Sequence, residues 1–109
     1  MLFRSLVKTY SIIYSEEAKQ DLINIKSYIK YNLKEPKIAE KLISKIKNEV
    51  ETLKSNPESF ALIDEEYIKR MEMRKIIVKN HIIFYIINNN NVEIVRIMNS
   101  RRNWIKLLK

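Results

Sequence analysis

The sequence lacks glycine and cysteine, and it has one histidine and two prolines in 109 residues. The absence of cysteine excludes disulfides, thiol catalysis and most structural zinc sites. A single histidine, His81, excludes a metal site built from several histidines of one chain, so we expect no metal and no cofactor. The absence of glycine excludes the P-loop and the dinucleotide fingerprint, whose backbones pass close to phosphates. Turns therefore need another residue that tolerates positive φ, and asparagine suits best.

Long hydrophobic runs are also missing. No apolar run approaches the roughly 20 residues that span a bilayer. Arg4 interrupts the apolar start, and no small-residue cleavage site follows it. We therefore expect a cytoplasmic protein with no membrane partner, built as a single domain over residues 1–109. Residues 1–8 are interpreted as an N-terminal extension without an assigned role.

Positive charge is abundant and unevenly distributed. The formal net charge is +8. Residues 1–70 hold 13 basic and 11 acidic side chains, whereas residues 71–109 hold 8 basic and 2 acidic ones. A concentration of one sign on a small domain favours an acidic or polyanionic partner.

The hydrophobic pattern predicts a strand, two helices, three strands and a short final helix. Ser15 is the expected N-cap of the first helix, Pro36 separates the two helices, and Pro57 follows the second. Ser100 is the expected cap of the final helix. Short β-rich runs predict the strands, at residues 9–15, 71–78, 81–87 and 92–98. The expected fold is a two-layer α+β domain, with an antiparallel sheet covered on one face by the helical hairpin.

The two expected strand hairpins predict which side chains are neighbours. A two-residue turn at Lys79-Asn80 places Arg74 opposite Tyr85. A symmetric loop at residues 88–91 places Ile87 opposite Val92 and Ile83 opposite Arg96. Because side chains alternate across a strand, one face then collects Arg74, His81, Tyr85, Arg96 and Met98. We interpret the other face as the helix-covered core; it collects Met73, Lys75, Ile77, Ile82, Phe84, Ile86, Glu93, Val95 and Ile97.

Four ordered stretches give the chain a wider resemblance. These are the strand followed by E-A-x-x-D-L, the N-P after the second helix, the R-x-I-x-V-x-N-x-x-I-F-Y strand pair, and the closing R-I-x-x-x-R-R. With these stretches the sequence resembles the RelE/ParE superfamily of bacterial toxins from type II toxin–antitoxin modules, and the resemblance covers residues 10–108. The resemblance implies a cognate acidic antitoxin as partner. It also implies one of two targets: DNA gyrase for ParE-like members, or the ribosome with its mRNA for RelE-like members.

The resemblance also implies candidate catalytic residues. Arg74 and Arg96 match strand arginines that grip phosphate in RelE-like members, and arginine binds phosphate bidentately. Tyr85 is the candidate acid–base group, with Lys79 and His81 as weaker candidates. If the protein is an enzyme, it is then a metal-independent endoribonuclease.

The C-terminal stretch favours binding over catalysis. RelE-like nucleases commonly carry a catalytic tyrosine or histidine there, whereas this chain has Asn99, Ser100, Asn103 and Trp104. A ParE-like gyrase inhibitor is therefore slightly favoured over a ribosome-dependent nuclease. A non-toxic basic domain that binds nucleic acid remains a third alternative. The candidate contacts to a target or antitoxin are Lys75, Lys79, Arg101, Arg102 and Trp104.

Overall fold

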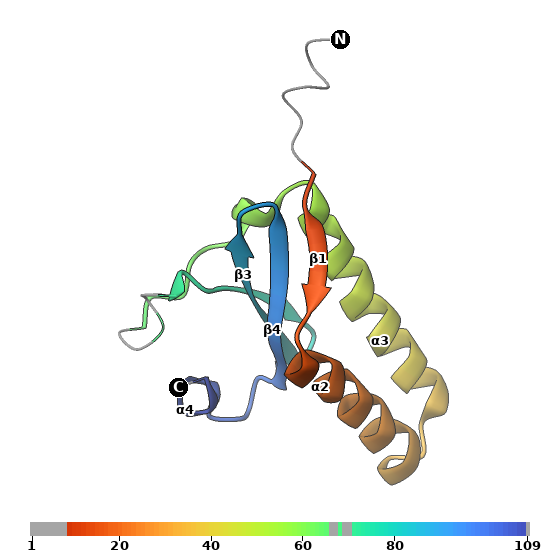
Figure 1. The fold of residues 1–109 in the computed structure, drawn as a ribbon. Coiled ribbons are helices and arrows are strands. Elements are labelled where there is room, and N and C mark those ends of the chain that lie inside the picture. Colours follow the sequence, from red (N-terminus) through yellow and green to blue (C-terminus); the bar gives the residue numbers. More distant parts are fainter. Residues whose placement is uncertain (1–8, 66–67, 69–70, 109) are drawn as a thin grey trace.

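A computed structural model describes residues 9–65, 68 and 71–108 (Figure 1). The order of strands and helices confirms the predicted order and the α+β class. The strands are β1 Ser11–Tyr14, β2 Arg74–Val78, β3 His81–Asn88 and β4 Asn91–Asn99. The α-helices are α2 Glu16–Ser27, α3 Pro36–Glu51 and α4 Trp104–Leu107. Shorter helical turns are the π-helix η1 Tyr28–Asn32 and the 3-10 helices η2 Thr52–Lys54 and η3 Pro57–Ser59. The expected extension at residues 1–8 lies outside the described residues.

The four strands form one mixed sheet in the order β1-β4-β3-β2. The two hairpins are antiparallel as predicted, but β1 pairs parallel with β4. The expectation of a wholly antiparallel sheet is therefore wrong at this edge. Parallel neighbours need a long crossover connection, and here the helical hairpin and two strands intervene between β1 and β4.

The helical hairpin covers one face of the sheet (Figure 1). Ser15 caps α2 as predicted, because its Oγ accepts a hydrogen bond from the Ala18 backbone N–H at 3.0 Å. Pro36 opens α3, where a missing N–H is tolerated. The π-helix η1 follows α2, and its Leu33 N–H bonds to the Tyr28 carbonyl at 3.1 Å. This wider turn departs from α-helical spacing, and Leu33, which follows it, is exposed.

The assignment of the two sheet faces from sequence is wrong for β2 and β3, although Ile97 and Met98 at the end of β4 lie on the predicted faces. Tyr85 is fully buried on the face that the helices cover, whereas Phe84 lies in a second cluster on the opposite face. The helix-side cluster takes its sheet residues from all three long strands: Ile76, Val78, Ile83, Tyr85, Val92, Ile94 and Ile97. Alternation could not distinguish the faces because β3 is apolar on both sides. The second cluster is closed by residues before β2 and by α4, which sequence patterning did not place there.

A β-bulge changes the predicted register of the second hairpin. The first hairpin pairs Arg74 with Tyr85, and the second pairs Ile87 with Val92, both as predicted. The register then shifts between Phe84 and Tyr85, so that Arg96 pairs with Phe84 and not with Ile83. Val95 is the extra residue. Partners across a sheet project to the same face, so the bulge separates Arg96 from the face that holds Tyr85.

The final helix α4 packs on the second cluster. The ring of Trp104 lies 5.4 Å from that of Phe84, measured between centroids. Asn103 caps this helix, with its side chain accepting from the Lys106 N–H at 3.4 Å. The expected cap, Ser100, instead lies in the turn after β4, where its N–H bonds to the Asn80 carbonyl at 2.8 Å.

Turns without glycine impose backbone strain. The described residues with positive φ are Lys34, Glu72, Lys79 and Asn89, so asparagine fills one such position and charged residues fill three. A left-handed conformation costs a residue with a Cβ atom about 1–2 kcal/mol.

We therefore expect Lys79→Gly, at φ 53°, to raise the free energy of unfolding by about 0.5–1 kcal/mol, because glycine adopts this conformation without a Cβ clash. Urea denaturation measures the change. Lys79→Ala is the control, since it removes the charge but keeps the Cβ atom. An equal gain in both variants would contradict an origin in backbone strain.

Candidate functional site

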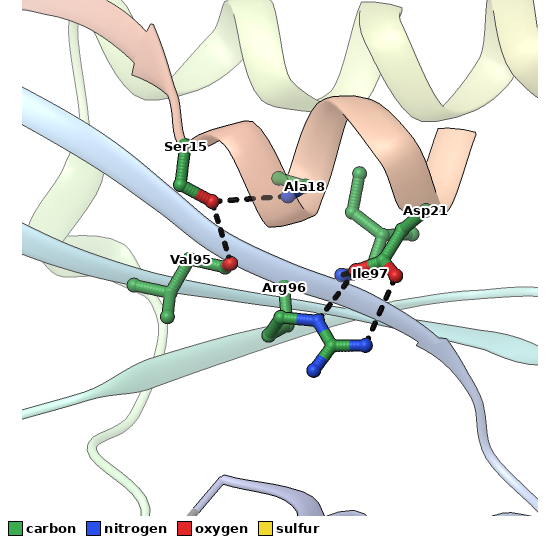
Figure 2. Close-up of polar contacts among 6 residues, drawn as sticks. All are labelled: Ser15, Ala18, Asp21, Val95, Arg96 and Ile97. Atoms are coloured by element: carbon green, nitrogen blue, oxygen red, sulfur yellow. Dashed lines mark hydrogen bonds and ion pairs between the residues drawn. The ribbon is translucent and has the colours of Figure 1, made fainter. Parts of the chain in front are cut away.

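A buried carboxylate, Asp21 of α2, joins the helical hairpin to strand β4 (Figure 2). Its Oδ2 accepts from Arg96 Nε at 2.7 Å and from the Ile97 backbone N–H at 2.9 Å. Its Oδ1 accepts from Arg96 Nη2 at 3.0 Å. These bonds raise the pKa of Arg96 above its ordinary value, so its guanidinium stays charged. Arg96 is therefore held by Asp21 and lies away from Tyr85, which corrects the predicted three-residue cluster.

Sequence reasoning missed Asp21. It follows Ala18 by three residues and precedes Ile25 by four, which places a carboxylate on the apolar stripe of the first helix. An acidic residue at such a position needs a buried partner. A carboxylate on the apolar face of a helix was therefore the signal in the sequence that Asp21 needs a buried cationic partner. That partner is Arg96.

Arg74 and Tyr85 remain neighbours as predicted, but both donate to the same backbone segment. Tyr85 OH donates to the Pro57 carbonyl at 2.7 Å. Arg74 Nη1 donates to the carbonyls of Phe60 and, at 3.3 Å, Glu58. Burial raises the pKa of Tyr85 to about 12, an effect that the nearby Arg74 charge partly opposes. At neutral pH this hydroxyl is therefore a protonated, bonded group.

A groove of about 960 Å³ lies between the helical hairpin, the β2–β3 turn and the end of β4. It gathers two predicted contact residues, Lys79 and Arg102, and adds Lys41 of α3. None of these three cations makes an ion pair among the residues that the structure describes. The groove's apolar wall comes from the helical hairpin and its connection; it includes Ile25, Tyr28, Leu33 and Ile38.

His81 also lines this groove. Burial lowers the pKa of its imidazole, so the ring is neutral at pH 7. Its Nδ1 is buried and has no hydrogen-bond partner within the described part of the chain. A buried polar atom without a partner is uncommon in folded proteins, and it leaves this hydrogen-bonding group unsatisfied beside the groove.

The remaining predicted contact residues lie elsewhere. Lys75 Nζ stands 4.9 Å from the centroid of the Trp104 ring, on the second face of the sheet. Arg101 is exposed in the turn after β4, where its N–H bonds to Asn99 Oδ1 at 2.9 Å. The predicted binding residues thus divide between the groove and the α4 face. In residues 9–65, 68 and 71–108, no group of three or more histidine or acidic side chains could hold a metal ion.

Comparison of the sequence with known protein families identifies the family of this chain. Residues 12–104 match the sequence pattern of the family described as the ParE toxin of the type II toxin–antitoxin system parDE. The chain belongs to this ParE toxin family. A search of proteins with curated functions gives no match. No helix in the described ranges of this ParE-family toxin is long and apolar enough to cross a membrane.

Solved structures agree with the fold of a ParE toxin. The chromosomal ParDE toxin–antitoxin system from P. aeruginosa superposes with a TM-score of 0.71 at 19% identity, covering 85% of this chain and 98% of that chain. The RelBE2 toxin–antitoxin complex from Mycobacterium tuberculosis superposes with a TM-score of 0.57 at 15% identity, covering 84% and 92%. At these identities the likeness concerns the fold, so roles of individual residues must come from the geometry.

Asp21→Ala should lower the free energy of unfolding of this ParE-family toxin by about 3 kcal/mol. Removing one member of a buried ion pair leaves the other charge, here Arg96, without compensation. The Ile97 N–H loses its acceptor as well. Thermal unfolding should shift down by more than about 10 °C. Glu16→Gln is the control, because it breaks the exposed 3.3 Å pair with Lys19 and should change stability by less than about 1 kcal/mol. Similar losses in both variants would contradict the proposed importance of Asp21.

Tyr85→Phe should lower the free energy of unfolding by about 1 kcal/mol at pH 7, since the Pro57 carbonyl loses its donor. It should also reduce the alkaline loss of stability. An ordinary tyrosine, as in the unfolded chain, ionises near pH 10, whereas folded Tyr85 ionises at about 12. Wild-type stability contributed by this group is therefore complete below pH 10 and falls by about 2–3 kcal/mol as pH rises to 12.

Urea titrations at several pH values between 7 and 11 measure this effect as the difference between wild type and Tyr85→Phe. Tyr31→Phe is the matched control, because Tyr31 is exposed. Parallel alkaline curves for wild type and Tyr85→Phe would show that the buried hydroxyl does not produce the pH dependence.

Proposed function

We propose that this ParE-family toxin arrests growth by binding and inhibiting DNA gyrase, without cutting RNA. Family membership over residues 12–104 supports the ParE-like branch. The gyrase target itself is carried over from the resemblance that the sequence shows.

The arrangement of Arg74, Tyr85 and Arg96 is the observation that carries this proposal. Cleavage of RNA by its 2′-hydroxyl needs an acid, a base and a cation around one phosphate. Tyr85 is buried and donates to Pro57, whereas Arg96 pairs with Phe84 on the opposite face and is engaged by Asp21 at the edge of β4. Arg74 donates to two carbonyls beside Tyr85. The candidate groups thus stabilise the fold, and they do not surround an open position for a phosphate.

The groove supplies the best surface for the antitoxin partner. Lys41, Lys79 and Arg102 present positive charge at its rim, and its one acidic lining residue, Asp21, is already paired. The wall formed by the helical hairpin is apolar. We infer that an acidic amphipathic segment of the antitoxin occupies this groove, with carboxylates at the cations and apolar side chains against the helices.

Expression of the chain alone should arrest growth, and the purified protein should inhibit supercoiling of relaxed DNA by gyrase. It should leave mRNA on programmed ribosomes intact, because Arg74, Tyr85 and Arg96, the main candidates for RNA cleavage, do not surround an open phosphate position. Gel assays of plasmid topology and primer extension on the transcript, run in parallel with one protein preparation, measure the two activities.

Two outcomes would favour the alternatives. Ribosome-dependent cuts in the transcript, lost in Arg74→Ala, would support the RelE-like nuclease and contradict gyrase inhibition as the sole activity. Normal growth at verified expression would contradict toxicity and favour the basic nucleic-acid-binding domain.

A further inference from the structure

We propose that the end of the helical hairpin, residues 28–38, is the element by which the toxin engages its target, and that it inserts into an apolar pocket with an acidic rim on a target protein. The inference rests on the proposed function, because it locates the surface that performs the inhibition. We call residues 28–38 the hairpin tip. Figure 1 shows that this end of the hairpin extends beyond the sheet.

Apolar side chains are exposed mainly at the hairpin tip. Six large apolar residues in the described parts of the chain are more than half exposed, and four of them lie within the tip. These are Tyr28, Tyr31, Leu33 and Ile38, with Tyr31 the most exposed at 66%. Helical hairpins in small domains usually keep polar residues at such ends, so a cluster of this kind marks an interaction surface.

The charge of the hairpin tip is complementary to an acidic partner. Lys30, Lys34 and Lys37 stand among the apolar residues, with Glu35 as the single acid. None of these lysines makes an ion pair with the described residues. Their charge therefore remains available, and it would guide the tip toward an acidic surface.

The backbone of the hairpin tip is held in one strained arrangement. The π-helical bond from Leu33 N–H to the Tyr28 carbonyl is followed by a 3.0 Å bond from Glu35 N–H to the Ile29 carbonyl. Lys34 takes φ 55° between them, where glycine would fit without strain. Single π turns and left-handed residues concentrate at functional sites. A fixed tip also loses little entropy on binding.

A protein pocket suits the hairpin tip better than nucleic acid does. Exposed tyrosines and lysines alone would suit a stacking platform for bases. Leu33 and Ile38 add aliphatic side chains that neither stack on bases nor bind phosphate. Tyrosine beside aliphatic anchors and a basic rim is the composition of a protein–protein contact.

The position of the tip beside the groove explains how an antitoxin could neutralise the toxin. Tyr28, Leu33 and Ile38 belong both to the tip and to the groove wall. A segment seated in the groove would cover these side chains and leave Tyr31 as the exposed large apolar residue of the tip outside the contact. Occupation of the groove would therefore block insertion of the tip.

The test compares serine substitutions at equally exposed positions. Tyr31→Ser and Leu33→Ser should each raise the toxin concentration for half-inhibition of purified gyrase by at least tenfold, and they should relieve growth arrest. Ile77→Ser is the matched control, because Ile77 is 63% exposed but lies on β2. It should behave as wild type. Thermal unfolding should be unchanged in all three variants, since the replaced side chains are exposed.

Charge variants provide a second readout. Lys30→Glu with Lys37→Glu should weaken inhibition at low salt by at least tenfold, whereas Lys45→Glu with Lys47→Glu on α3 should not. Full potency in both serine variants of the tip, or an equal loss in Ile77→Ser, would overturn the proposal. Binding of a labelled oligonucleotide that needs Tyr31 and Leu33 in the absence of gyrase would overturn it in favour of nucleic acid.

The growth assay separates failure of this proposal from failure of the gyrase target. If wild type arrests growth without inhibiting gyrase, that result contradicts the gyrase target. Loss of growth arrest in the tip variants would then still support the hairpin tip as the surface that engages the target. If wild type inhibits gyrase and the tip variants inhibit it equally, the target stands and the tip is wrong.

Discussion

The structure depends on how the backbone hydrogen-bonding groups of strand β4 find partners beyond the end of β1. The parallel pairing of these strands stops at Tyr14 and Ile94, and among the described residues no strand lies beside the rest of this edge of β4. Residues at the start of α2 take over. Ser15 N–H donates to the Ile94 carbonyl at 3.0 Å, Ser15 Oγ donates to the Val95 carbonyl at 2.8 Å, and Asp21 accepts from the Ile97 N–H. A helix thus completes the hydrogen bonding of a sheet edge, and this fixes where the helical hairpin lies.

The bulge at Val95 is part of the same contact between the edge of β4 and helix α2. Without the extra residue, Arg96 would share the helix-covered face with Tyr85, where a guanidinium would have to displace apolar side chains. With it, Arg96 leaves the strand on the Phe84 side and its head group meets Asp21 at the edge of β4 (Figure 2). An arginine that resembles a phosphate ligand in sequence therefore orients a helix. The cations left for partners are those of the turns, the groove and the hairpin tip.

Local sequence patterns predict most of the fold. The features that they miss depend on contacts between residues far apart in the sequence. The two-residue turn at Lys79 determined the register of the first hairpin, and Ser15 and Pro36 marked where the two long helices begin. The sequence could not decide which face of the sheet the helices cover, because Phe84 and Tyr85 project to opposite faces and both suit a hydrophobic core. The bulge was not decidable either, since it depends on Asp21, 75 residues from Arg96 along the chain. The predicted cluster failed at that point, whereas the pairing of Arg74 with Tyr85 followed from a local turn and was right.

The side chains available for function differ from those that the sequence suggests. The three leading catalytic candidates from the sequence have structural partners: Arg96 with Asp21, Tyr85 with Pro57, and Arg74 with Phe60. In the part of the chain that the structure describes, His81 Nδ1 at the groove has no hydrogen-bond partner, and Lys34 of the hairpin tip has a strained backbone. Unsatisfied groups and local strain lower stability, so their presence at the groove and the hairpin tip favours a role there in binding; the strain at Glu72 and Asn89 lies in other turns. In a toxin that must be inhibited by one partner and active on another, adjacent surfaces let the first partner block the second.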